Sequence, residues 1–70
     1  MSLESLIQLI DDASRDASLW TRLMEWPQEV MDEYSVSDDE LEALRSGNLT
    51  QLREFGVDEY HLETARDLAA

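Results

Sequence analysis

The chain has 70 residues, which is room for one domain, and its 17 acidic side chains against 5 arginines leave a formal net charge of −12. Such a surface is repelled by nucleic-acid phosphates and by anionic membranes, so neither is expected as a partner. Because cysteine is absent, disulfides and thiolate metal sites are excluded. No apolar stretch approaches the roughly 18 residues of a membrane span. The N-terminus, Met1-Ser2-Leu3-Glu4, lacks the basic region of a signal peptide, so a cytoplasmic protein is expected.

The first half of the chain has the three- and four-residue periodicity of helices. Two apolar stripes show it, namely Leu3, Leu6, Ile7, Ile10 and Ala13, and then Leu19, Trp20, Leu23 and Met24. Asp16 is suited to cap the second helix, but the residues leave open whether segment 14–18 breaks the first helix or continues it. Pro27 disfavours helix at Trp26 and fits the first position of a new helix. The apolar side of that third helix is predicted to be Val30, Met31 and Tyr34.

The clearest local signal is the run Val36-Ser37-Asp38-Asp39-Glu40-Leu41, which predicts a helix start. The Ser37 hydroxyl can accept a hydrogen bond from the backbone N–H of Glu40, while the Glu40 carboxylate accepts one from the N–H of Ser37. This pattern is a capping box, and Val36 and Leu41 take the two positions of a hydrophobic staple.

Two more short helices are predicted in the last third of the chain. Gly47 is expected to end the preceding helix through a left-handed conformation. Asn48 can then cap a helix with Gln51 as its box partner, Gly56 can end it, and Asp58 can cap the last helix. Their apolar stripes are Leu49, Leu52 and Phe55, and then Tyr60 or His61 with Leu62, Ala65 and Leu68. With no strand-like alternation and no linker, residues 1–70 are expected to be one all-α domain, a compact bundle of five or six short helices.

Residues with catalytic potential are few. His61 is the only histidine, and no serine lies in the sequence context of a hydrolase nucleophile. The acidic run Asp38-Asp39-Glu40 with Glu42 lacks the spaced oxygen ligands and central glycine of a calcium loop, so it is better explained as a capped helix start. Gly47 and Gly56 are explained as helix ends, which leaves no phosphate-binding loop. We therefore expect no catalysis, no metal and no cofactor.

The tryptophans and methionines are more informative. Two tryptophans in so small a domain are usually core residues, but tryptophan is also enriched at interface hot spots. Methionine suits adaptable contact surfaces. Because so small a core should leave at least one aromatic side chain available, we expect an apolar docking patch with an acidic rim. Its expected residues are Trp20, Met24, Trp26 and Met31, with Asp38 and Asp39 as the rim.

The segment from Pro27 onwards resembles the helical small (alpha) subunit family of protocatechuate 4,5-dioxygenase, the extradiol ring-cleaving enzymes. Members show a "P-E-A" turn, a capped helix, an "[SA]-G-[DN]" turn and an "L-G-V" turn before a final helix. The matching elements are Pro27-Gln28-Glu29-Val30-Met31, Val36-Ser37 through Leu44, Ser46-Gly47-Asn48 with Leu52, and Phe55-Gly56-Val57. The resemblance covers roughly residues 26–68 and implies an accessory subunit, since in that family the large subunit holds the iron and the catalytic base.

A similar fold occurs in the recognition domains of ribosomally made peptide precursors, including those of split (borosin-type) backbone N-methyltransferases. The resemblance therefore implies a docking module for a larger enzyme chain, either an extradiol catalytic subunit or a peptide-modifying enzyme. The segment 66–70 is predicted to be the end of a helix rather than a flexible core peptide, which favours the function of an accessory small subunit. A further alternative is an acidic protein that mimics nucleic acid and occupies a basic cleft.

Overall fold

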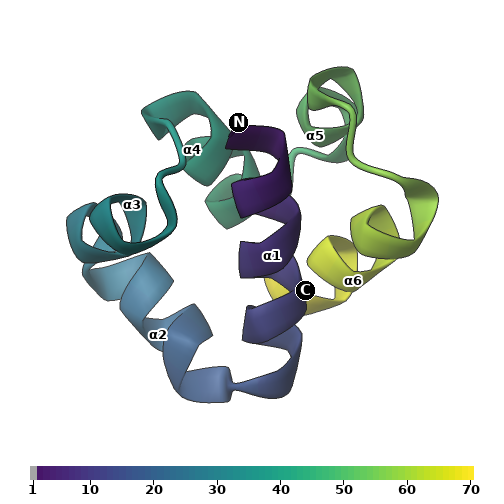
Figure 1. Ribbon diagram of the computed structural model, residues 1–70. Helices are drawn as coiled ribbons and strands as arrows, with labels where there is room; N and C mark the ends of the chain where they lie inside the picture. The colour runs from purple at the N-terminus through teal and green to yellow at the C-terminus, as the bar shows by residue number, and fades with distance from the viewer. Residues whose placement is uncertain (1) are drawn as a thin grey trace.

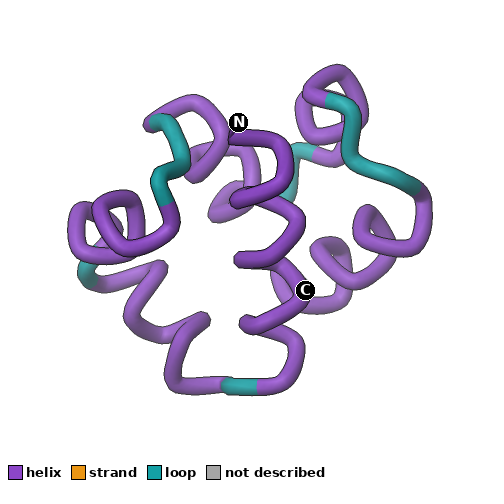
Figure 2. The backbone as a smooth tube through the Cα atoms, viewed as in Figure 1, coloured by secondary structure: helices purple, strands orange, loops and turns teal. Residues whose placement is uncertain are grey.

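The computed structural model describes residues 2–70, and these residues form six α-helices and no strand. The helices are α1 (Ser2–Arg15), α2 (Ala17–Glu25), α3 (Pro27–Tyr34), α4 (Asp38–Ser46), α5 (Leu49–Phe55) and α6 (Glu59–Ala69). Figure 1 shows α1 in the middle, with α2 and α3 on one side of it and α5 and α6 on the other. The turns between helices are only one to three residues long (Figure 2). The predicted fold class, an all-α bundle of five or six short helices, is confirmed.

The central helix α1 packs against α2, α3 and α6. Its buried side chains are Leu6, Leu9, Ile10 and Ala13. The predicted stripe contained Ile7 and omitted Leu9, whereas Ile7 is only half-buried in the structure. The four buried positions follow the i, i+3, i+4, i+7 spacing of one helix face, and Ile7 lies on the flank of that face.

Every later helix contributes to the same core. Its other buried residues are Leu19, Leu23, Val30, Val36, Leu41, Ala43, Leu44, Leu52, Val57, Leu62 and Ala65. Tyr60 and His61 were alternatives for the stripe of α6, and the structure decides between them. The Tyr60 side chain is 68% exposed, whereas that of His61 is only 17% exposed.

The segment 14–18 breaks the first helix. Asp16 separates α1 from α2, and its carboxylate accepts hydrogen bonds from the Ser18 amide at 3.0 Å and the Ser18 hydroxyl at 2.7 Å. These bonds hold the pKa of Asp16 below its ordinary value, with the hydroxyl bond contributing most. Asp16 therefore acts as the N-cap that the sequence predicted.

The capping box at the start of α4 is present in full. Ser37 Oγ accepts from the Glu40 amide at 3.2 Å, and the Ser37 amide donates to Glu40 Oε1 at 2.9 Å. Val36 and Leu41, the predicted staple, are both buried. Glu40 is itself 5% exposed, so its charge is buried against the backbone groups that it caps.

The two glycines end their helices as predicted. Gly47 has φ +72° and Gly56 has φ +108°, both in the left-handed region that favours glycine. After each glycine, the next amide returns to a carbonyl of the helix just ended. Asn48 accepts from the Gln51 amide at 3.1 Å, and Asp58 accepts from the His61 amide at 3.2 Å, so both predicted N-cap residues are confirmed. The Gln51 half of the predicted box is not formed, because the Asn48 amide donates to the Ala43 carbonyl instead.

Candidate functional site

The most exposed tryptophan lies where two helices meet. Trp26 is both the C-cap of α2 and the N-cap of α3. Its amide donates to the Arg22 carbonyl at 2.6 Å, and its carbonyl accepts from the Glu29 amide at 3.1 Å. Pro27 follows at the first position of α3, as predicted. The backbone of Trp26 is thus held from both sides, while its side chain is 59% exposed.

Met24 lies two residues earlier and is 40% exposed. We call residues 24–26 the Met24–Trp26 corner. Its middle residue, Glu25, is exposed and acidic. Within residues 2–70, the large apolar side chains that are exposed are Met24, Trp26 and Tyr60. Two of these three are at the corner, and Tyr60 is the second residue of α6, the helix on the other side of α1 (Figure 1). The corner therefore presents an aromatic and a thioether side chain beside a negative charge.

The other two apolar residues of the predicted patch lie deeper. Trp20 and Met31 are partly buried and pack against the core. Trp20 is four residues before Met24 on α2, which places the two on neighbouring turns of one helix face. The structure thus gives Trp20 and Met31 packing partners inside the domain and leaves Met24 and Trp26 facing solvent.

The predicted acidic rim lies at the start of α4. Asp38 and Asp39 are exposed, and they occupy the first turn of that helix. Arg45, in the last turn of the same helix, contacts the carbonyl of Met24 at 3.0 Å. The two acids are thus at the end of α4 opposite to that contact. Asp39 also lines a shallow hollow of about 340 Å³ between α4 and α5, with Glu42, Ala43, Ser46, Asn48 and Gln51.

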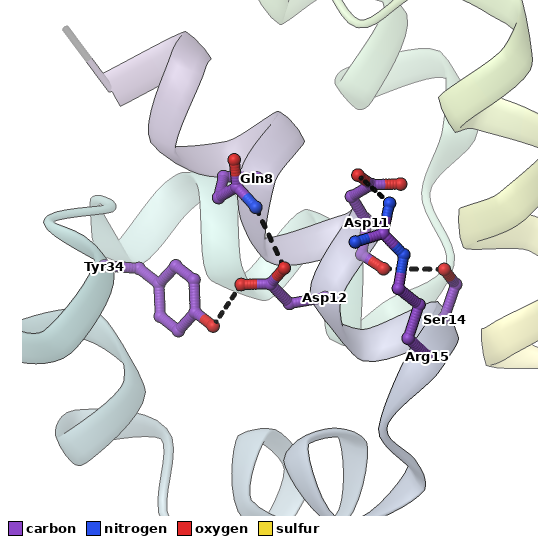
Figure 3. Close-up of polar contacts among 6 residues, drawn as sticks. All are labelled: Gln8, Asp11, Asp12, Ser14, Arg15 and Tyr34. Carbon is purple, nitrogen blue, oxygen red and sulfur yellow. Dashed lines mark hydrogen bonds and ion pairs between the residues drawn. The ribbon is translucent and has the colours of Figure 1, made fainter.

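One polar contact that the sequence did not indicate joins α1 to α3. The Tyr34 hydroxyl donates to Asp12 Oδ2 at 2.7 Å, and Gln8 donates to the other Asp12 oxygen at 2.9 Å (Figure 3). Burial, and then this bond to a carboxylate, raise the pKa of Tyr34 to about 12. The sequence placed Tyr34 on an apolar helix side only. Its bond to Asp12 ties α3, and with it the Met24–Trp26 corner, to the central helix.

The only histidine takes part in a helix cap. His61 Nδ1 lies 2.7 Å from Asp58 Oδ1, and the Asp58 carboxylate also accepts from the His61 amide. These bonds, the side-chain one first, lower the pKa of Asp58. Within residues 2–70 no group of three His, Asp or Glu side chains is placed to hold a metal ion. None of the six helices is both long and apolar enough to cross a lipid bilayer.

Comparison of the chain with protein-family models, with curated proteins and with solved structures finds no match. The resemblance to the dioxygenase small subunit therefore rests on the sequence elements named above.

Proposed function

We propose that this protein is a non-catalytic docking module that binds a larger enzyme chain through the Met24–Trp26 corner. The observation that carries the proposal is the exposed Trp26 side chain on a backbone fixed by two helices. Exposing so much of a tryptophan is unfavourable in water, and its truncation at an interface typically costs about 2 kcal/mol or more of binding free energy. A rigid backbone also reduces the entropy lost on binding.

The net charge of −12 specifies the chemistry of the partner. A partner that meets this surface needs an apolar pocket for Trp26 surrounded by basic side chains. Exposed carboxylates such as Asp38 and Asp39 then accelerate the encounter, while the apolar anchor sets how slowly the complex dissociates. The resemblance to the dioxygenase small subunit favours an extradiol catalytic subunit as that partner, in the cytoplasm. A peptide-modifying enzyme is the alternative.

Affinity retention in the native host tests this function. The tagged chain, its Trp26→Ala variant and its Tyr60→Ala variant are compared by quantitative mass spectrometry of the retained proteins. Tyr60 is the matched control, because it is an aromatic residue at least as exposed as Trp26 and lies away from the corner. We expect one larger enzyme chain to be retained by the wild type and by Tyr60→Ala, and to be lost with Trp26→Ala.

The identity of the retained enzyme separates the two settings. An extradiol catalytic subunit supports the accessory-subunit function, and a peptide methyltransferase supports the precursor function. Equal retention by all three chains, or retention of no larger chain by the wild type, would contradict docking through the corner.

A further inference from the structure

Arg45 makes a long-range contact with the Met24–Trp26 corner. Its Nη2 atom donates to the Met24 carbonyl at 3.0 Å, across 21 residues of sequence. Met24 lies in the last turn of α2, where carbonyl groups have no later helical amide to bond. The α2 helix therefore receives, from a side chain of α4, a hydrogen bond that its own backbone cannot supply.

The charge of Arg45 interacts favourably with the C-terminal ends of two helices. Arg45 is in the last turn of α4, and its guanidinium also reaches the last turn of α2. A cation near a helix C-terminus is stabilising because the helix dipole is negative there, and here one guanidinium serves two such ends. Its Nη1 atom lies 3.6 Å from the Glu42 carboxylate on the same helix.

The guanidinium is also partly withdrawn from water. The Arg45 side chain is 30% exposed, and its Nε atom is buried without a hydrogen-bond acceptor among the residues that the structure describes. A buried donor without an acceptor is unfavourable, and the hydrogen bond and the ion pair made by the two Nη atoms offset that cost. The contact thus fixes the side chain as well as the turn.

We infer that Arg45 is a positioning residue, which holds the Met24–Trp26 corner in its binding shape before a partner arrives. The inference rests on the proposed function of that corner. Without Arg45, the last turn of α2 is free to fray, and the Trp26 side chain loses its fixed platform. The partner must then reorder the corner on binding, which weakens the complex.

Amide hydrogen exchange and NMR relaxation test this role on the isolated protein. The variants are Arg45→Gln, the conservative Arg45→Lys, and Arg53→Gln as control. Arg53 forms a short interhelical ion pair with Glu59 at 2.8 Å, on α5 and away from the corner. In Arg45→Gln, we expect the Trp26 amide to exchange about tenfold faster, the ratio that corresponds to losing one charged hydrogen bond. The Trp26 indole N–H should also become more mobile.

The lysine variant keeps one donor within reach of the Met24 carbonyl, so it should restore most of the protection at Trp26. Arg53→Gln should leave the exchange rate of the Trp26 amide unchanged. Unaltered exchange at Trp26 in Arg45→Gln would overturn the inference. Equal acceleration at the core amide of Leu52 would overturn it as well, because Arg45 would then act only on global stability. No partner is needed, so this result is independent of the retention experiment.

Discussion

The turn between α3 and α4 depends on a serine in an unfavourable conformation. Ser35 has φ 59° and ψ 40°, and it is the only residue other than glycine with positive φ among those described. Its amide donates to the Met31 carbonyl at 2.8 Å, which ends α3. Only glycine adopts this left-handed region at no steric cost, so Ser35 stores a strain of about 1–2 kcal/mol.

The Ser35→Gly variant should therefore be more stable. Relief of the strain outweighs the extra entropy that glycine loses on folding, and we expect a gain of about 0.5–1 kcal/mol in the free energy of unfolding. Urea denaturation measures it as a higher midpoint with an unchanged slope. Gly47→Ala should instead lower the free energy of unfolding. Gly47 also lies in the left-handed region, and an added Cβ there would lie 3.1 Å from the Ala69 Cβ. A destabilised Ser35→Gly would show that the serine side chain stabilises the turn.

The Tyr34 hydroxyl should make stability depend on pH in the alkaline range. The pKa of Tyr34 is raised to about 12, so the folded state prefers the neutral phenol more than the unfolded chain does. The resulting stabilisation is complete below about pH 10 and is lost as the pH rises to about 12. The chain has no lysine or cysteine, so few other side chains titrate in this interval.

The Tyr34→Phe variant should lose this alkaline decrease in the free energy of unfolding. It should also be less stable by about 1–2 kcal/mol at neutral pH, because the hydrogen bond to Asp12 is removed. Tyr60→Phe is the control and should retain the wild-type pH dependence, since its side chain is exposed. Urea denaturation across the alkaline range gives the answer, and an identical decrease in Tyr34→Phe would refute the role assigned to this hydroxyl.

At the scale of the helix, the starts and ends were predictable because their physics is local. The caps at Asp16, Ser37 and Asp58 each join groups two or three residues apart, so the sequence alone contains both partners. The contacts of Tyr34 and Arg45 span 22 and 21 residues. Their partners depend on how helices pack, which no short sequence pattern encodes.

The core and the proposed docking patch were likewise predictable only in part. Helical periodicity identified most buried positions, but the choice of Leu9 over Ile7 depends on which neighbours α1 meets. Likewise, the sequence identified the region of Trp20, Met24 and Trp26 but not which of them the core would absorb. The one-residue turn at Trp26, enforced by Pro27, is what keeps that side chain outside.

The Ser37→Ala variant tests the capping box of α4. Removing the hydroxyl leaves the Glu40 amide without its acceptor, and N-cap losses of this kind cost about 1 kcal/mol. Thr21→Ala is a suitable control, because Thr21 is exposed in the middle of α2, where its hydroxyl only donates to the Ala17 carbonyl of the same helix at 3.3 Å. Thermal and urea unfolding should show the loss for Ser37→Ala only, and equal midpoints for the two variants would mean that the box contributes nothing.

At the scale of the whole molecule, we expect the negative charge to govern how the proposed partner approaches. Neutralising the start of α4 with Asp38→Asn and Asp39→Asn should lower the association rate and flatten its dependence on salt. A matched control also removes two negative charges, one from α5 and one from α6, with Glu54→Gln and Glu63→Gln. Stopped-flow association with the retained enzyme compares the two. Equal slowing would show that only net charge matters and that α4 does not face the partner.

The dissociation rate of the Trp26→Ala variant from the enzyme retained in the native host tests docking through the Met24–Trp26 corner most directly. It is measured beside a circular dichroism melt of the same variant. The account predicts a normal melt, because the side chain is exposed, and dissociation about thirtyfold faster, which corresponds to the loss of about 2 kcal/mol at an interface anchor. A folded Trp26→Ala variant that dissociates at the wild-type rate would contradict it.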